Sequence, residues 1–147
     1  MKKYIINKNT LALLSENKGT KVVEKYITYH IENTIYNILD ESTKFYGSSY
    51  VGRCKSSAYL LGICQKCPII ISEIKEIIFF PSLSIKNEYC AWFNIVGIEK
   101  YYSEEKNYLN ITLINGVNVK IKCSGYVFSN QYLKAVRLNT ILKRNNK

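Results

Sequence analysis

Few residues in this 147-residue sequence have the type and spacing that catalysis needs. The single histidine, His30, follows Tyr29, and no serine or cysteine is tied to it by sequence, so a nucleophilic triad has no support. The eleven acidic residues are mainly scattered, which leaves little basis for paired-carboxylate chemistry. The sequence therefore predicts a protein that is not an enzyme.

The five cysteines offer a different chemistry, which is metal binding or thiol exchange. Cys64 and Cys67 form a C-x-x-C pair, and Cys90 with Cys123 would complete four thiolates for a structural zinc ion. The second close pair that would make such a site convincing is missing. A redox C-x-x-C usually begins a helix, whereas Pro68 and a strand-like run follow Cys67. We therefore expect no metal and no cofactor, and small buried or partly exposed thiols.

The stretch KFYGSSYVGR, residues 44–53, combines glycines, hydroxyl groups, aromatic rings and two cations. It is not a P-loop, because the Gly-Lys-Ser/Thr ending is absent and no apolar strand leads into it. Gly47 and Gly52 predict a tightly turned backbone, while the hydroxyls and cations favour an anionic partner. Two interpretations stay open: the stretch offers N–H groups and hydroxyls to phosphates, or it is a structural turn.

The positive charge of the chain is segregated along the sequence. The net charge is +10, and no Asp or Glu occurs from Ser42 to Ser72, a window that carries four cations. None occurs after Glu105 either, where eight cations follow, and the remainder of the chain sums to −2. Segregated positive charge is typical of nucleic-acid binders. An acidic protein or lipid surface, or a merely solubilising surface, is also compatible with it.

The N-terminal residues do not predict an export signal. MKKYIINKNTLALL carries cations, but the polar residues 7–10 interrupt its apolar run. The longest apolar runs, PIII and IIFF, have the length of strands and are far shorter than a membrane span. An odd number of cysteines without an export signal favours reduced thiols in a cytoplasm, and no membrane partner is expected.

Apolar periodicity and turn residues predict one α+β domain over residues 1–147, built from antiparallel hairpins and two helices. Residues 4–6 and 11–14 are expected to pair around NKNT, and KCPIII with KEIIFFP to form a hairpin of buried strands. Residues 89–101 are expected to form a longer strand with a break at Gly97. Helical spacing predicts a helix near 34–44 that ends before Gly47.

The clearest local pattern is the hairpin NYLNITLINGVNVKIKC, with Asn115-Gly116 at its turn. A two-residue loop would place the alternating apolar residues of the two strands on opposite faces. A three-residue loop with Gly116 in the left-handed conformation restores a common apolar face, so we favour that turn. This register leaves Lys120 and Lys122 on the solvent side.

The last segment, near residues 126–143, contains no Gly or Pro and is predicted to be a helix. Its apolar arc consists of Phe128, Tyr132, Ala135 and Leu142. A second arc, at spacing i, i+3, i+7 and i+10, consists of Lys134, Arg137, Ile141 and Arg144. This basic stripe is suited to lie along phosphates, and a simple solvated face is the alternative interpretation.

Four motifs in order carry a resemblance to a known family. KFYGSSYVGR, then KCPIII, then IIFFPSLS and then Cys-Ala-Trp resemble the competence transcription factor (ComK) family of low-G+C Gram-positive bacteria. The dense similarity covers about residues 43–93, and a weaker one continues through the Asn115-Gly116 hairpin. Cys67 stands where the family usually has a proline. Better-known members continue beyond position 147 with a tail linked to activation and to adaptor-mediated proteolysis.

The resemblance implies an activator of DNA-uptake genes that binds A/T-rich boxes as a dimer or higher oligomer, engages the minor groove and meets the transcription machinery. We expect Arg53 to enter that groove, because Gly47 and Gly52 let the backbone come close, and the C-terminal cations to neutralise phosphates. The candidate DNA-binding residues are Lys44, Tyr46, Ser48, Ser49, Tyr50, Arg53, Lys55, Lys66, Lys134, Arg137, Lys143 and Arg144. The alternative is a shortened paralogue that dimerises with a full-length relative and modulates it.

Overall fold

The computed structural model describes residues 3–63 and 65–147, and in these ranges the chain forms two antiparallel sheets and three helices. The larger sheet consists of β1 (Thr10–Glu16), β2 (Gly19–Glu24), β3 (Thr28–Ile31), β4 (Ile69–Ser72), β5 (Ile77–Pro81) and β6 (Trp92–Asn94), in the order β3-β2-β1-β6-β5-β4. The smaller sheet consists of β7 (Ile98–Glu105), β8 (Tyr108–Leu113) and β9 (Asn118–Lys122). The helices are α1 (Ile35–Phe45), α2 (Tyr50–Leu61) and α3 (Gly125–Asn145), and the expected α+β class is confirmed.

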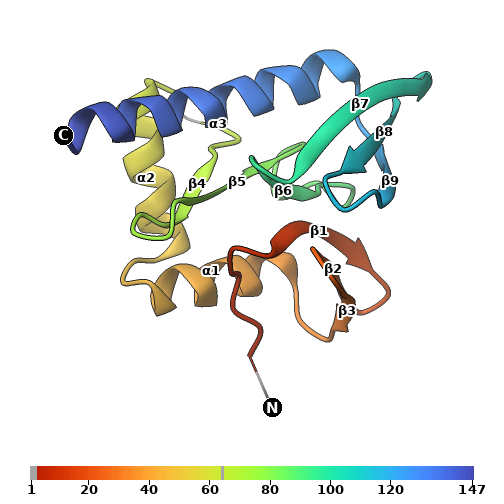
Figure 1. Ribbon diagram of the computed structural model, residues 1–147, viewed down its shortest axis with the longest axis horizontal. Helices are drawn as coiled ribbons and strands as arrows, with labels where there is room; N and C mark the ends of the chain where they lie inside the picture. Colours follow the sequence, from red (N-terminus) through yellow and green to blue (C-terminus); the bar gives the residue numbers. More distant parts are fainter. Residues whose placement is uncertain (1–2, 64) are drawn as a thin grey trace.

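The strands β4, β5 and β6 of the larger sheet are buried on both faces, between α1 on one side and α3 with the smaller sheet on the other (Figure 1). Phe79 and Trp92 share a core with α1. Their chain neighbours Phe80 and Phe93 point the other way, because successive residues of a strand face opposite sides. Both rings contact Phe128 of α3, with centroids 5.4 and 5.5 Å away. Burial of both faces explains why β4 and β5 are continuous apolar runs without polar alternation.

Side-chain caps fix where the two expected helices begin. Thr34 caps α1 by accepting a hydrogen bond from the Asn37 N–H, and Ser124 caps α3 by accepting one from the Val127 N–H. Both helices are confirmed, with bounds within about two residues of the expected ones. None of the helices that the structure describes is both long and apolar enough to cross a membrane.

The expected hairpin of residues 108–123 is confirmed in its register. Leu109 pairs with Ile121 and Ile111 with Val119, so the apolar residues of β8 and β9 lie on one buried face. Gly116 has φ +88°, which is the left-handed conformation that the three-residue loop requires. The same register leaves Lys120 and Lys122 exposed.

The expected hairpin around NKNT is wrong. Residues 4–6 form no strand, and β1 pairs instead with β2 through the turn at Asn17-Lys18. The NKNT segment closes its own turn, because the Asn7 N–H donates to Oγ1 of Thr10 at 3.0 Å. The preceding residues then lie along α1, where the Ile6 N–H donates to Oγ of Ser42 at 2.9 Å. Side-chain hydrogen bonds in this polar segment therefore satisfy backbone N–H groups that strand pairing would otherwise have used.

The expected long strand over 89–101 is corrected to two separate strands, β6 of three residues and β7 of eight. The break at Gly97 is present, but β6 belongs to the larger sheet and β7 to the smaller one. Gly97 lies so close to β1 that an added Cβ would come within 3.2 Å of the Leu11 carbonyl oxygen. A close backbone approach, and not merely an interruption of one strand, is the reason for glycine at this point.

Candidate nucleic-acid interface

The stretch KFYGSSYVGR forms the junction between α1 and α2. Gly47 has φ +98°, which confirms the tight turn predicted there. The turn predicted at Gly52 is wrong, because Gly52 lies in the first turn of α2. Ser49 caps this helix, since its Oγ accepts a hydrogen bond from the Gly52 N–H at 3.0 Å. Ser48 also contributes to the junction, where its N–H donates to the Thr43 carbonyl at 2.9 Å.

The tyrosines of this stretch connect the junction to the rest of the fold. The Tyr46 hydroxyl donates to the Ile6 carbonyl at 2.9 Å. The Tyr50 N–H donates to Oδ1 of Asp40 at 3.0 Å, and its ring packs edge-on against Trp92 with centroids 6.1 Å apart. Burial raises the pKa of the Tyr50 hydroxyl. These contacts support a structural role for both tyrosines, because they hold the α1–α2 junction on the larger sheet.

Arg53 does not extend into solvent. Its side chain is 15% exposed and points toward Glu73, with Nη1 and Oε1 3.8 Å apart. Its Nε is buried and has no hydrogen-bond partner among the described residues. The sequence did not predict α2, and it is this helix that directs Arg53 against the β4–β5 turn. This conformation does not favour the expected insertion of Arg53 into a DNA groove.

Two other expected cations lie on the α1 and α2 surface. Lys44 is exposed but pairs with Asp40 one helical turn earlier, at 2.9 Å. Lys55 is exposed on α2 beside Tyr59, which is 87% exposed. The two lysines are therefore available to an anionic partner, although the Asp40 carboxylate offsets the charge of Lys44.

The longest basic surface is the outer side of α3. This 21-residue helix contains no Asp or Glu. From Tyr126 to Thr140 its exposed residues recur every three or four positions and so share one side, which Arg144 continues. We call this side the α3 face, and it consists of Tyr126, Asn130, Leu133, Arg137, Thr140 and Arg144. The basic stripe expected from the sequence differs in one respect, since Ile141 is half-buried and Lys134 lies at the edge of the face.

Beside the N-terminal half of this helix, three of the expected cations come together. Lys66, from the α2–β4 loop, lines a concavity of about 500 Å³ with Lys134 and Arg137 of α3. Neutral side chains complete its lining, including Tyr126, Asn130 and Gln131. We call this site the basic concavity. No carboxylate lines it among the described residues.

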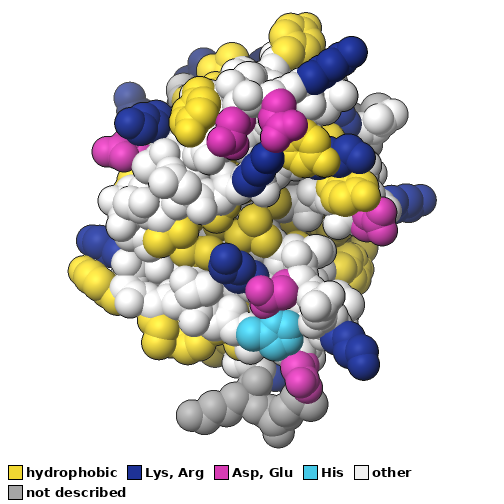
Figure 2. All heavy atoms as spheres, turned by 90° about the vertical axis from the view of Figure 1, so that its right-hand side faces the viewer, with side chains coloured by type: hydrophobic (Ala, Val, Ile, Leu, Met, Phe, Trp, Pro, Cys, Tyr) yellow, Lys and Arg dark blue, Asp and Glu magenta, His cyan; other side chains and the backbone are white. Residues whose placement is uncertain are grey.

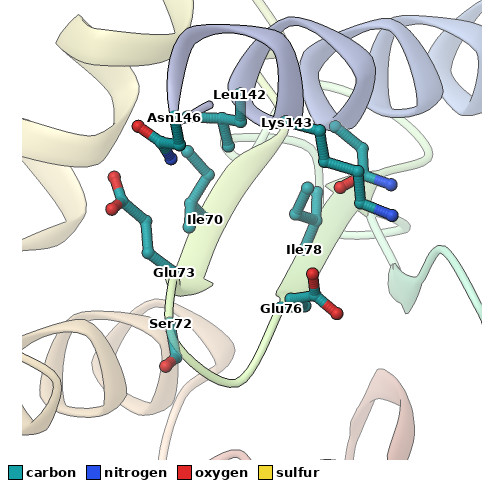
Figure 3. Close-up of a pocket in the computed structure, with 9 residues that line it drawn as sticks. Ile70, Ser72, Glu73, Glu76, Ile78, Leu142, Lys143 and Asn146 are labelled. Carbon is teal, nitrogen blue, oxygen red and sulfur yellow. The ribbon is translucent and has the colours of Figure 1, made fainter.

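The C-terminal half of α3 has different surroundings. Lys143 lines a pocket of about 340 Å³ whose opposite wall carries Glu73 and Glu76 of the β4–β5 turn (Figure 3). Its apolar lining includes Ile70, Ile78 and Leu142. We call this site the mixed pocket. The two carboxylates line the same pocket as Lys143, so this cation lies in a less positive local field than Arg137.

The end of the molecule formed by β1–β3 and β7–β9 carries both signs of charge, with basic and acidic side chains interspersed (Figure 2). Lys120 of β9 pairs with Glu105 of β7 at 2.7 Å. His30 of β3 lies 2.5 Å from Glu16 of β1, so the single histidine has a carboxylate partner rather than a serine or cysteine. This end therefore lacks the one-signed surface that α3 presents.

Metal binding receives no support from the described residues, among which no three His, Cys, Asp or Glu side chains cluster. Of the C-x-x-C motif, Cys64 lies outside the described residues. Cys90 and Cys123 are buried as thiols, and burial raises the pKa of Cys123 to about 11. Neutral buried thiols of this kind are poor nucleophiles.

One important residue of the basic concavity was not among the sequence-based candidates. Gln131 is 2% exposed, and its amide group donates to the carbonyls of Lys66 and Pro81 at 2.9 and 3.0 Å. Its Oε1 accepts a hydrogen bond from Nζ of Lys134 at 2.8 Å. A signal was present in the sequence, because Gln131 falls between Phe128 and Ala135 on the apolar side of the helix. A polar residue at such a position needs buried partners.

Comparisons with known proteins agree with the resemblance carried by the motifs. The family model described as ComK protein matches residues 1–147. The competence transcription factor of Bacillus subtilis (strain 168) is 28% identical over 144 residues, which cover 95% of this chain and 75% of that protein. A solved LytTr DNA-binding domain of a response regulator from Bacillus cereus has a TM-score of 0.39 and 14% identity, covering 85% of this chain and 81% of that one. This last similarity is too low to support an argument.

The first and last of the four motifs that suggested the family also meet in space, since Tyr50 packs on Trp92. The family model leaves no part of residues 1–147 unmatched at either end. On this evidence the chain belongs to the ComK family.

Proposed function

We propose that this protein is a DNA-binding transcriptional activator of competence and DNA-uptake genes. The proposal rests on membership of the ComK family and on the name of the Bacillus subtilis relative, competence transcription factor. The structural observation that carries it is the α3 face, an acid-free surface that runs along 21 residues beside the basic concavity. A helix of this length extends about 30 Å, which is enough to meet many phosphates of a duplex.

We further propose that A/T-rich duplexes are recognised through the minor groove. An α-helix is about 10 Å wide and the minor groove only about 6 Å, so α3 itself cannot enter it. In this arrangement α3 lies along the phosphates, and single long side chains reach into the groove. Arg137 and Arg144 are exposed on the α3 face and replace Arg53 as the candidates for that role. Narrow A/T-rich grooves attract such cations through their enhanced negative potential.

The test is a fluorescence-anisotropy titration of labelled A/T-rich and G/C-rich duplexes at two salt concentrations. We expect affinity to fall steeply with salt and to favour the A/T-rich duplex. Arg137→Gln is expected to weaken binding and reduce the A/T preference. Lys18→Gln, which removes the same charge at the β1–β2 turn, is the matched control and is expected to bind as the parent does.

Binding that does not depend on salt, or that Arg137→Gln leaves intact, would contradict this assignment. Absence of DNA binding combined with co-purification of a longer relative would favour the alternative of a protein-interaction module. Sedimentation of the protein–DNA complex tests the accompanying proposal that the protein binds as a dimer or higher oligomer. In the cell we expect it in the cytoplasm, where it would meet DNA and the transcription machinery.

A further inference from the structure

The basic concavity is held in shape by a buried hydrogen-bond network. Gln131 uses both amide hydrogens on the carbonyls of Lys66 and Pro81, which ties the α2–β4 loop and the end of β5 to α3. Its Oε1 holds the ammonium group of Lys134 at 2.8 Å. The side chain that makes these three contacts is 2% exposed, so solvent does not compete for them. The position of Lys134 and of the Lys66 backbone is therefore set before any ligand arrives.

The network keeps like charges together. The pKa of Lys134 is lowered first by burial and then by the nearby charge of Lys66. No carboxylate offsets these charges among the described residues that line the concavity. Bringing two ammonium groups together costs free energy that a bound anion would recover. An uncompensated, fixed cluster of this kind is the arrangement expected of an anion-binding site.

Other groups at the concavity match the size and geometry of a phosphate. Arg137 lines the concavity from the exposed side of α3, where it is assigned to the groove and not to this phosphate. Asn130 adds a neutral amide to the lining, and Tyr126, 78% exposed, supplies a ring beside it. Lysine ammonium groups act as point charges and need no fixed direction of approach. The two lysine ammonium groups and the Asn130 amide can thus surround one tetrahedral anion.

We propose that the basic concavity binds a single phosphate group, which the DNA backbone supplies when the protein is bound to its site. Phosphate binding at this site does not depend on the proposed function, whereas the assignment of that phosphate to the DNA backbone rests on it. A phosphate seated at one fixed point beside α3 would set the register of the α3 face on the duplex. Such contacts position a protein without reading sequence, which leaves the reading to Arg137 and Arg144 at the groove.

The first experiment uses inorganic phosphate on the free protein. Titration at constant ionic strength, followed by NMR, is expected to shift the side-chain amide signals of Gln131 and Asn130. Lys134→Gln is expected to abolish the saturable shift, whereas Lys18→Gln is expected to leave it unchanged. A shift that never saturates, or that persists in Lys134→Gln, would overturn the site even if DNA binding is strong.

The second experiment asks whether Lys66 and Lys134 hold the same phosphate of a duplex. Each single Gln substitution is expected to weaken duplex binding by about tenfold. If both lysines serve one phosphate, the double variant loses clearly less than the product of the single losses, because the second substitution acts on a contact already broken. Independent losses that multiply would overturn the proposal of one shared phosphate.

The two experiments together separate the site from the proposed function. Saturable phosphate binding without any duplex affinity would support the site and assign it to a free phosphate-bearing molecule, against the DNA proposal. Duplex binding without saturable phosphate binding would leave the DNA proposal standing and remove the site. Substitution of Gln131 by Leu is avoided as a primary test, because two buried carbonyls would lose their donor and the loop itself would move.

Discussion

The two halves of α3 carry the same kind of side chain in opposite surroundings. In the N-terminal half, Lys134 meets Lys66 and the neutral amide of Gln131. In the C-terminal half, Lys143 shares the mixed pocket with Glu73 and Glu76. The difference comes from the elements opposite the helix, which are the α2–β4 loop in one case and the β4–β5 turn in the other. How strongly a cation of α3 can attract DNA phosphates thus depends on the side chains that face it across the packing interface.

Arg53 belongs to the same comparison. It lies in α2, yet its guanidinium is directed at Glu73, which also lines the mixed pocket. The β4–β5 turn therefore offsets positive charge from both α2 and α3. The basic concavity and the α3 face, in contrast, carry cations with no carboxylate among their described residues.

Removing charge from the basic concavity should have the largest effect. The double variant Lys134→Gln/Arg137→Gln is expected to lose about 100-fold in duplex affinity, because each charge-assisted contact contributes about 1.5 kcal/mol. The slope of log affinity against log salt is expected to become shallower by about two. Anisotropy titrations over a series of salt concentrations measure both quantities. An unchanged slope would show that these side chains do not meet phosphates, and circular dichroism confirms that the variant is folded.

Arg53→Ala tests whether Arg53 acts through the fold or through DNA. We expect a loss of about 1–2 kcal/mol in the free energy of unfolding, since the substitution removes packing of the long side chain against the β4–β5 turn. A/T preference of the folded variant is expected to stay the same. Urea unfolding and duplex titrations give the two results. Unchanged stability together with lost A/T preference would instead support insertion of Arg53 into the DNA groove.

Local patterns predicted the hairpin β8–β9 and the helix α3, because alternation around Asn115-Gly116 and a long segment without Gly or Pro are both local features. They did not predict α2. Its buried residues are Ser57 and Leu61 only, so no apolar stripe marks the helix. Start and stop signals were nevertheless present, namely Ser49 as N-cap and Gly62 with φ +68° at the end.

The charged sites depend on contacts that no spacing rule reveals. Lys66 and Lys134 are far apart in sequence, and Gln131 bridges them by bonding the backbone carbonyl of Lys66 and the side-chain ammonium group of Lys134. Lys143 and Glu73 are similarly distant and share a pocket only through the packing of α3 on β4 and β5. The acid-free windows predicted that an anion-binding surface exists. Tertiary packing determines which cations compose that surface.

Glu76→Gln tests the comparison of the two halves of α3 by removing a carboxylate from the mixed pocket. Removing this carboxylate leaves Lys143 less compensated, so we expect duplex affinity to rise by about threefold at low salt. The gain is expected to shrink at high salt, where exposed charges are screened. Glu76 is preferable to Glu73 for this test, because Glu73 also faces Arg53. Unchanged affinity on this substitution would mean that the mixed pocket does not lie near the duplex.

Lys143→Gln is the smallest expected change and the most direct control for Lys134→Gln, since both remove one ammonium group from the same helix. Glu73 and Glu76 already offset much of the field of Lys143, so its loss is expected to weaken duplex binding by only about twofold. The loss should be similar for A/T-rich and G/C-rich duplexes, because a phosphate contact carries no sequence information. In the Glu76→Gln background the same substitution should cost more, because the offset is reduced. If Lys143→Gln and Lys134→Gln cost the same in both backgrounds, the opposing carboxylates do not distinguish the two halves of α3.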